Sequence, residues 1–272
     1  PFNKSYWDGE LVSKLASHMT DREFADWIVI DGPGSGNLQA DNLFTEPGGY
    51  GLSGTLFGKG WEENVSHALA MIKGKTDWQR KSLTKQEYDR LKKANVPIED
   101  LDRTGCWLWR TYDYGTRKVT PQQLQEKIIQ IFRKKDEKGR PIPKQVNLVG
   151  WSRGGISCHM LANAMQADPE LKHINVNIFA IDPVPGALNF QAHRVTLGPN
   201  VKQYVCFYAR DERSKGFACV APRTAPGTNV HIFPMAGRHA TLVGNAALDG
   251  ANGPKALVEP GLIIRHYAEQ CL

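Results

Sequence analysis

At the centre of the sequence stands the segment Val146-Asn147-Leu148-Val149-Gly150-Trp151-Ser152-Arg153-Gly154-Gly155. Its first half is a short apolar run that predicts a strand ending at Gly150. Gly150 to Gly154 then matches the pattern G-x-S-x-G. Between a strand and a helix this pattern is typical of a nucleophile elbow, a tight turn that holds Ser152 in a strained backbone conformation. The alternative is a glycine-rich turn with an ordinary exposed serine. A helix is predicted to follow, because apolar residues recur at helical spacing at Ile156, Met160, Leu161 and Met165.

The rest of the chain alternates predicted strands with predicted helices, which favours a mostly parallel sheet. With 272 residues, 41% of them apolar, the chain is long enough to bury one sizeable core. We therefore expect residues 1–272 to form a single α/β domain, with helices on both faces of the sheet. The other expected strands are 27–30, 176–181, 203–208 and 229–233, and further helices are expected at 61–72, at 120–132 and around His266.

The segment from about residue 73 to residue 118 does not have the pattern of a sheet, and we expect it to be an inserted cap over the sheet edge. The capping-box pattern at residues 84–87 predicts a short helix within it. Trp107 and Trp109 in this segment suit a lipid interface, because their rings are apolar while their N–H groups can stay hydrated. The alternative is that both rings pack inside the cap.

Positive charge is concentrated in the middle of the chain. Residues 73–144 contain 19 Lys and Arg against 10 Asp and Glu, a net charge of +9, whereas the whole chain has a net charge of +6. Such a segment suits an anionic surface, for example a membrane with anionic phospholipid. The alternative is a solvated lysine-rich face. No nucleic-acid-binding motif accompanies the charge, so nucleic acid is not an expected partner.

The partners of Ser152 are sought at the carboxyl ends of strands, where open α/β sheets bind their ligands. Asp182, Asp211 and His239 each follow a predicted strand, and the order Ser, Asp, His is that of α/β hydrolases. His239 is the expected general base, because it alone among the eight histidines lies in a glycine-flanked loop after a late strand. Asp182 is the favoured carboxylate, because it follows an apolar strand and precedes a proline-rich turn. Asp211 has charged neighbours and is the alternative.

An acyl-transfer site also needs N–H donors for a developing oxyanion. Arg153, the residue after the nucleophile, offers one such donor at the start of the predicted helix. The loop Asp31-Gly32-Pro33-Gly34 stands where a second donor is expected, and because Pro33 has no N–H, Gly32 or Gly34 would supply it. The alternative for these glycines is a flexible turn.

The five cysteines include no C-x-x-C pair, so we expect neither a zinc site nor a disulfide framework, and no cofactor or metal ion. Pairing of Cys206 with Cys219 across a hairpin is a minor alternative. No stretch approaches the roughly 20 apolar residues of a membrane span. The first residues lack the apolar region of a cleavable signal peptide, which leaves export by a specialised system open.

Taken together, several segments resemble a bacterial serine-hydrolase family that includes type VI secretion lipase effectors. The sequence departs from the family pattern at Pro33, where threonine is usual, and after His239, where an Asp-Val-Gly-Gly run is common. The segments that carry the resemblance are Asp31-Gly32 with Asn37, Gly58-Lys59-Gly60-Trp61-Glu62-Glu63-Asn64-Val65, residues 150–155, Asp182-Pro183-Val184, Asp211-Glu212-Arg213 and Gly237-Arg238-His239.

The resemblance implies the α/β-hydrolase fold and attack on the carboxylic ester bonds of phospholipids, with Ser152, Asp182 and His239 as the catalytic triad. It also implies contact with a membrane surface and, for an antibacterial or host-directed effector, a secretion apparatus or an immunity protein as partner. Two alternatives stay open. One is hydrolysis of a soluble ester, thioester or peptide, and the other is a non-catalytic interaction module on a hydrolase scaffold.

Overall fold

The computed structural model describes residues 10–22, 25–30, 61–74, 82–83, 102–104, 111–113, 128–186, 190–251, 253 and 256–272. Several sequence-based expectations lie outside these residues. They concern Gly32 and Gly34, Trp107 and Trp109, the helix expected from the capping box at 84–87, and the first part of the helix expected at 120–132, of which residues 128–132 are described and helical.

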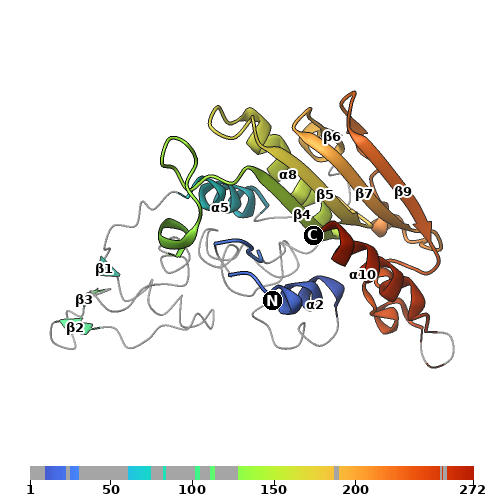
Figure 1. The fold of residues 1–272 in the computed structure, drawn as a ribbon. Coiled ribbons are helices and arrows are strands. Elements are labelled where there is room, and N and C mark those ends of the chain that lie inside the picture. Colours follow the sequence, from blue (N-terminus) through green and yellow to red (C-terminus); the bar gives the residue numbers. More distant parts are fainter. Residues whose placement is uncertain are drawn as a thin grey trace.

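The centre of the fold is a four-stranded sheet in which every neighbouring pair is parallel (Figure 1). Its order is β4-β5-β7-β9, so the strands stand side by side in chain order, and β4 and β9 are its edges within the described residues. This confirms an α/β fold with a central parallel sheet. The strand bounds are Gln145–Trp151 for β4, Asn175–Ile181 for β5, Val201–Ala209 for β7 and Asn229–Met235 for β9.

Helices cover both faces of the sheet, as expected from the apolar strands (Figure 1). On one face α5 (Trp61–Lys73) and α8 (Arg153–Ala167) pack with strand residues such as Ile178 and Tyr204 in one apolar cluster. On the other face α2 (Leu11–His18) and α10 (Glu259–Cys271) pack with Phe179 and Phe207 in a second cluster. The two clusters draw on alternate residues of the same strands, because successive side chains of a strand point to opposite faces.

Smaller elements surround this sheet. A two-stranded parallel pair joins β6 and β8, and short helical segments fill the loops that follow the strands. Their bounds are Ala192–Val195 for α9, Thr196–Leu197 for β6, Arg223–Thr224 for β8, Lys215–Phe217 for η1, Thr241–Val243 for η2 and Ala246–Asp249 for η3.

Two expectations from the sequence are wrong. Trp27 forms only an isolated bridge and residues 28–30 are irregular, so the strand expected at 27–30 is not formed. The segment from 73 to 118 does contain sheet, because β1 (Ser82–Leu83) and β2 (Asp102–Thr104) pair antiparallel with β3 (Thr111–Asp113). Figure 1 shows this small sheet apart from the four-stranded one. Strands of two or three residues carry too little apolar periodicity to be predicted.

Arg133, one of the basic residues in the middle of the chain, has a structural role. The Arg133 guanidinium donates hydrogen bonds to the carbonyl oxygens of Ala25 at 3.1 Å, Met71 at 2.7 Å, Ile72 at 3.0 Å and Pro141 at 3.2 Å. Burial lowers the pKa of this guanidinium to about 10, against a smaller effect of the Asp26 charge, which raises it. The side chain therefore fastens residues 128–144 to the last turn of α5.

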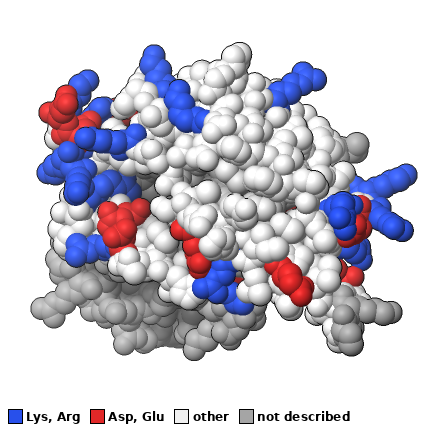
Figure 2. Space-filling model, turned by 45° about the vertical axis from the view of Figure 1, so that its right-hand side comes forward, with Lys and Arg blue, Asp and Glu red and all other residues white. Residues whose placement is uncertain are grey.

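The surface charge is mixed on the face shown in Figure 2. Basic and acidic side chains lie together toward the left and right margins, and the middle of this face is largely uncharged. Opposite charges in contact cancel much of each other's field beyond a Debye length of about 10 Å. The described residues on this face therefore form no single patch of one sign.

The cysteines in the described part of the chain are free thiols: Cys158, Cys206, Cys219 and Cys271. The alternative of a disulfide between Cys206 and Cys219 is therefore wrong. No helix of the described residues is both long and apolar enough to cross a membrane.

The core on the α8 face gives a stability prediction. Ile178 is 1% exposed in the second strand of the sheet, whereas Ile232, on the edge strand β9, is 49% exposed. Ile178→Ala leaves a cavity between sheet and helix, so we expect it to lower the free energy of unfolding by about 2–5 kcal/mol. The matched change Ile232→Ala is expected to cost about 1 kcal/mol or less. Urea unfolding of both variants measures the difference, and equal costs would contradict the described packing.

Candidate functional site

The turn after β4 places Ser152 at the carboxyl edge of the sheet. Ser152 has φ 57° and ψ −124°, a backbone conformation that costs a non-glycine residue free energy. Hydrogen bonds hold it there. Its N–H donates to the Ile181 carbonyl at 2.9 Å, and its carbonyl accepts the N–H groups of Gly155 at 3.0 Å and Val184 at 3.2 Å. The strained turn expected from the sequence is therefore present and is fixed by the strand next to it.

Two glycines make room for this turn, and the second of them is not the glycine that ends the G-x-S-x-G pattern. A Cβ atom on Gly150 would overlap the backbone of Gly154 and Gly155, so this position requires glycine. A Cβ atom on Gly155 would lie 2.9 Å from the Cβ of Pro183, whereas one on Gly154 would meet nothing within 4 Å. The second close approach is therefore at Gly155 and not at Gly154. Because Gly154 and Gly155 are adjacent, the sequence alone does not show which of them makes the close approach.

The Ser152 hydroxyl points away from the helix that it precedes. Serine at the N-cap of a helix commonly accepts a hydrogen bond from that helix, but Ser152 makes no such side-chain bond to α8. Instead its oxygen lies 2.8 Å from His239 Nε2. His239 is only 4% exposed and lies in the loop after β9. The structure thus brings together two residues that are 87 positions apart in the chain.

The other ring nitrogen of His239 is bonded to Asp182. The Nδ1 atom lies 2.6 Å from Asp182 Oδ2, and Asp182 is 1% exposed. Because a carboxylate only accepts, Nδ1–H donates here and Nε2 is left to accept the Ser152 O–H. Asp182 Oδ1 accepts the Ala209 N–H at 3.0 Å, and the φ of 43° at Asp182 turns the carboxylate toward the histidine. Asp182, His239 and Ser152 therefore form one continuous chain of hydrogen bonds.

Two aromatic rings flank the His239 imidazole. The Trp151 ring stacks on it with centroids 5.0 Å apart, and its Nε1–H donates to the His239 carbonyl at 3.3 Å. The Phe217 ring lies on it with centroids 4.7 Å apart. No pattern in the sequence indicates a role for Phe217, because it lies in a short polar turn without apolar periodicity. The Trp151 contacts and the hydrogen bond to Asp182 hold the imidazole in one orientation.

Asp211, the alternative carboxylate, does not reach the imidazole. Its Oδ2 accepts the Gly237 N–H at 2.8 Å and its Oδ1 contacts Arg210 at 3.2 Å. The next residue, Glu212, accepts the His239 backbone N–H at 3.3 Å. Both carboxylates therefore hold the backbone of the histidine loop.

A third carboxylate completes this support. Asp249 accepts the N–H groups of Ala240 at 3.1 Å and Thr241 at 2.6 Å, and also the Thr241 hydroxyl at 2.7 Å. Arg238 spans two of the carboxylate residues, because it pairs with Glu212 at 3.2 Å and donates to the Asp249 carbonyl at 2.9 Å. The roles of Glu212 and Asp249 in holding the histidine loop were not predicted. A charged loop residue looks the same in sequence whether it faces water or accepts a backbone N–H.

Of the residues expected to form an oxyanion hole, one is described. Arg153 follows Ser152 directly and is the first residue of α8, and N–H groups at the start of a helix point toward bound anions. Its carbonyl accepts the Trp61 Nε1–H at 3.3 Å and the Ser157 hydroxyl at 3.1 Å. The contribution expected from Gly32 or Gly34 stays a prediction.

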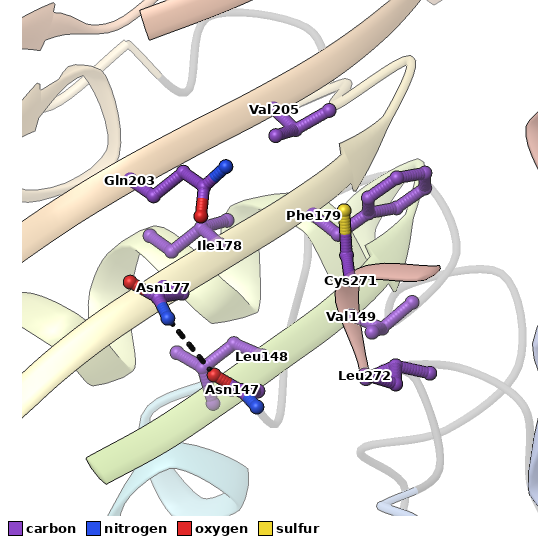
Figure 3. Close-up of a pocket in the computed structure, with 10 residues that line it drawn as sticks. All are labelled: Asn147, Leu148, Val149, Asn177, Ile178, Phe179, Gln203, Val205, Cys271 and Leu272. Carbon is purple, nitrogen blue, oxygen red and sulfur yellow. Dashed lines mark hydrogen bonds between the residues drawn. The ribbon is translucent and has the colours of Figure 1, made fainter. Parts of the chain in front are cut away.

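A hollow in the surface lies at the other end of the same strands (Figure 3). Asn147, Asn177 and Gln203 line it from three neighbouring strands, and Cys271 and Leu272 close it from the end of α10. The Asn177 amide donates to the Asn147 oxygen at 3.1 Å, as drawn in Figure 3. Because these residues begin the strands while Ser152 follows the end of one, the hollow is separate from the Ser152 site.

The described residues contain no group of three or more His, Cys, Asp and Glu side chains that could hold a metal ion.

Comparison with protein-family models and with curated proteins finds no match to this chain.

His159 is a buried histidine with a structural role. It is fully buried in α8, where Nδ1 lies 2.8 Å from the Arg194 carbonyl oxygen and Nε2 lies 3.1 Å from the Tyr204 hydroxyl. A neutral ring satisfies both contacts, with Nδ1–H donating and Nε2 accepting. Burial lowers its pKa to about 4, although the bond to Arg194 acts in the opposite direction. His159 therefore stays neutral in the folded protein.

This lowered pKa gives a pH prediction. The unfolded chain binds a proton at His159 below about pH 6.5, while the folded protein does not until about pH 4. The stabilisation is therefore complete above the unfolded pKa and is lost as the pH falls from about 6.5 to about 4. The loss is on the order of 3 kcal/mol, at 1.36 kcal/mol per pKa unit. Urea unfolding at several pH values should show a weaker acid dependence for His159→Gln than for the wild type. The exposed control His173→Gln should keep the wild-type slope, and equal slopes for all three proteins would contradict the prediction.

Proposed function

We propose that the protein is a serine hydrolase that cleaves carboxylic ester bonds through an acyl-enzyme on Ser152. The observation that carries the proposal is the hydrogen-bonded chain from Asp182 through His239 to Ser152, with distances of 2.6 and 2.8 Å. The strained turn at Ser152, which presents its hydroxyl to a histidine instead of to its own helix, supports the same role.

In this mechanism the Ser152 oxygen attacks the ester carbonyl carbon while its proton moves to His239 Nε2. The buried Asp182 carboxylate stabilises the imidazolium that forms, and Arg153 N–H stabilises the oxyanion. The imidazolium then gives its proton to the leaving oxygen, the carbon–oxygen bond breaks and the alcohol departs. Water attacks the acyl-enzyme with the same proton transfers, which releases the acid and restores the Ser152 hydroxyl.

We assign the chain to the α/β-hydrolase fold within this proposal. The support is the position of the three residues. Ser152 follows β4, Asp182 follows β5 and His239 follows β9, which gives the order nucleophile, acid, base along one parallel sheet. All three therefore lie at the carboxyl ends of the strands, where sheets of this type bind ligands.

The proposed substrate class is phospholipid, so that the protein would act as a phospholipase at a membrane surface. This part rests on the resemblance to lipase effectors, which also makes a specialised secretion apparatus and an immunity protein the proposed partners. A panel of phospholipids, soluble esters, thioesters and peptides, with product analysis, separates the lipase from a hydrolase of soluble substrates. Absence of turnover on the whole panel would favour a non-catalytic interaction module.

The nucleophile is tested first. Ser152→Ala should lower ester hydrolysis by a factor on the order of 10⁴ or more, because the remaining site cannot form an acyl-enzyme. A serine-reactive fluorophosphonate should label the wild type at Ser152, as mass spectrometry of the digested protein would show. The exposed serine in α2 provides the control, since Ser17→Ala should keep full activity. Labelling at another residue would refute the assignment.

The two carboxylates are compared next. In Asp182→Asn the amide oxygen still accepts the Ala209 N–H, but the amide nitrogen now faces His239 Nδ1. The ring must then carry its proton on Nε2, where it cannot accept from Ser152. We expect a loss of about 10³–10⁴-fold in kcat. Asp211→Asn keeps an oxygen for the Gly237 N–H, so the expected loss is below about tenfold. Steady-state kinetics of both variants measures this order, and the reverse order would assign the role to Asp211.

A further inference from the structure

Phe217 is an exposed aromatic ring beside the proposed general base. Its side chain is 42% exposed, although its ring centroid lies 4.7 Å from that of His239. It belongs to neither of the two apolar clusters on the sheet faces, and η1 contains no buried residue. Core packing therefore does not account for an apolar ring at this position.

The turn that carries Phe217 is fixed at both ends. On one side Glu212 accepts the N–H groups of Arg213 at 3.0 Å and Ser214 at 2.7 Å, and the Phe217 N–H closes the turn on the Ser214 carbonyl at 3.0 Å. On the other side the Val220 N–H donates to the Pro183 carbonyl at 2.9 Å, next to Asp182. The backbone that carries the ring is therefore fixed before any ligand binds.

The proposed reaction determines on which side of Ser152 each half of the ester substrate lies. The leaving oxygen must receive its proton from His239 Nε2, so it must come within hydrogen-bond reach of that atom. The alcohol half of the ester therefore lies on the histidine side of Ser152, and the acyl half stays bonded to Ser152. A ring packed on the imidazole is consequently a neighbour of the alcohol half.

We propose that Phe217 forms an apolar wall of the leaving-group subsite and makes the enzyme selective for esters whose alcohol carries an aliphatic group. The inference rests on the proposed function and deepens it, because it concerns which alcohol is released. An aliphatic chain laid on the exposed ring leaves water, and each buried methylene contributes about 0.8 kcal/mol. One to two methylenes give roughly a tenfold preference, since 1.4 kcal/mol corresponds to a factor of ten.

The experiment uses ethyl, butyl and hexyl butyrate, which share one acyl group and differ only in the alcohol. We expect kcat/KM of the wild type to rise along the series. Phe217→Ala should lose about tenfold on the hexyl ester and less than about twofold on the ethyl ester. Phe217→Leu should keep most of the preference, because it restores apolar bulk. Phe190→Ala, which removes another exposed phenylalanine, should behave like the wild type.

Fluorophosphonate labelling separates a subsite from a support for His239. The leaving group of this reagent is fluoride, so Phe217→Ala should be labelled at the wild-type rate if the ring contacts only the alcohol. Equal losses in labelling and on all three esters would overturn the inference and make Phe217 a positioning residue for the imidazole. A wild type that is labelled at Ser152 but hydrolyses the hexyl ester no faster than the ethyl ester would overturn it too. A wild type that is not labelled at Ser152 would refute the proposed function itself.

Discussion

The site depends on hydrogen bonds that continue the parallel sheet by one residue beyond its strands. The Ser152 N–H donates to the last carbonyl of β5, that of Ile181, at 2.9 Å, and the Asp182 N–H donates to the carbonyl of Phe207 in β7 at 2.8 Å. The Arg210 N–H donates in the same way to Met235, the last residue of β9, at 2.9 Å. Because each loop starts in register with the neighbouring strand, the side chains that follow the strands have fixed relative positions.

This constraint explains why much of the site could be predicted from the sequence. Apolar runs identify the strands of a buried parallel sheet, and polar residues that directly follow them are brought to one edge. Asp182 was predicted in that way, whereas Ser152 was predicted from the G-x-S-x-G pattern and His239 from its glycine-flanked loop after a late strand. The choice between Asp182 and Asp211 is finer, since both follow a strand. Asp182 has a left-handed backbone conformation, whereas Asp211 accepts a hydrogen bond from the Gly237 N–H. Neither feature leaves a pattern in the sequence.

The rest of the surroundings could not be predicted, for physical reasons that differ from residue to residue. The apolar run at 27–30 indicated a strand, but among these residues only Trp27 forms a bridge, because apolar composition does not determine strand pairing. Glu212 and Asp249 are charged loop residues whose role is to satisfy backbone N–H groups, and that role depends on how the loop folds back. Phe217 contacts a histidine 22 positions later only because both loops leave the same edge of the sheet.

The histidine follows β9, one of the two edge strands of the sheet within the described residues. Within the described residues β9 pairs with β7 alone, and its Val230 and Ile232 are exposed, whereas the strand before Asp182 is paired on both sides. Edge strands open at a lower free energy than interior ones, and such openings occur without global unfolding. Fraying of β9 would withdraw His239 while the turn at Ser152 stayed folded on β5. If the proposed mechanism holds, a molecule with β9 frayed would keep the serine and lose its proposed base, so heating would abolish hydrolysis before the whole domain unfolds.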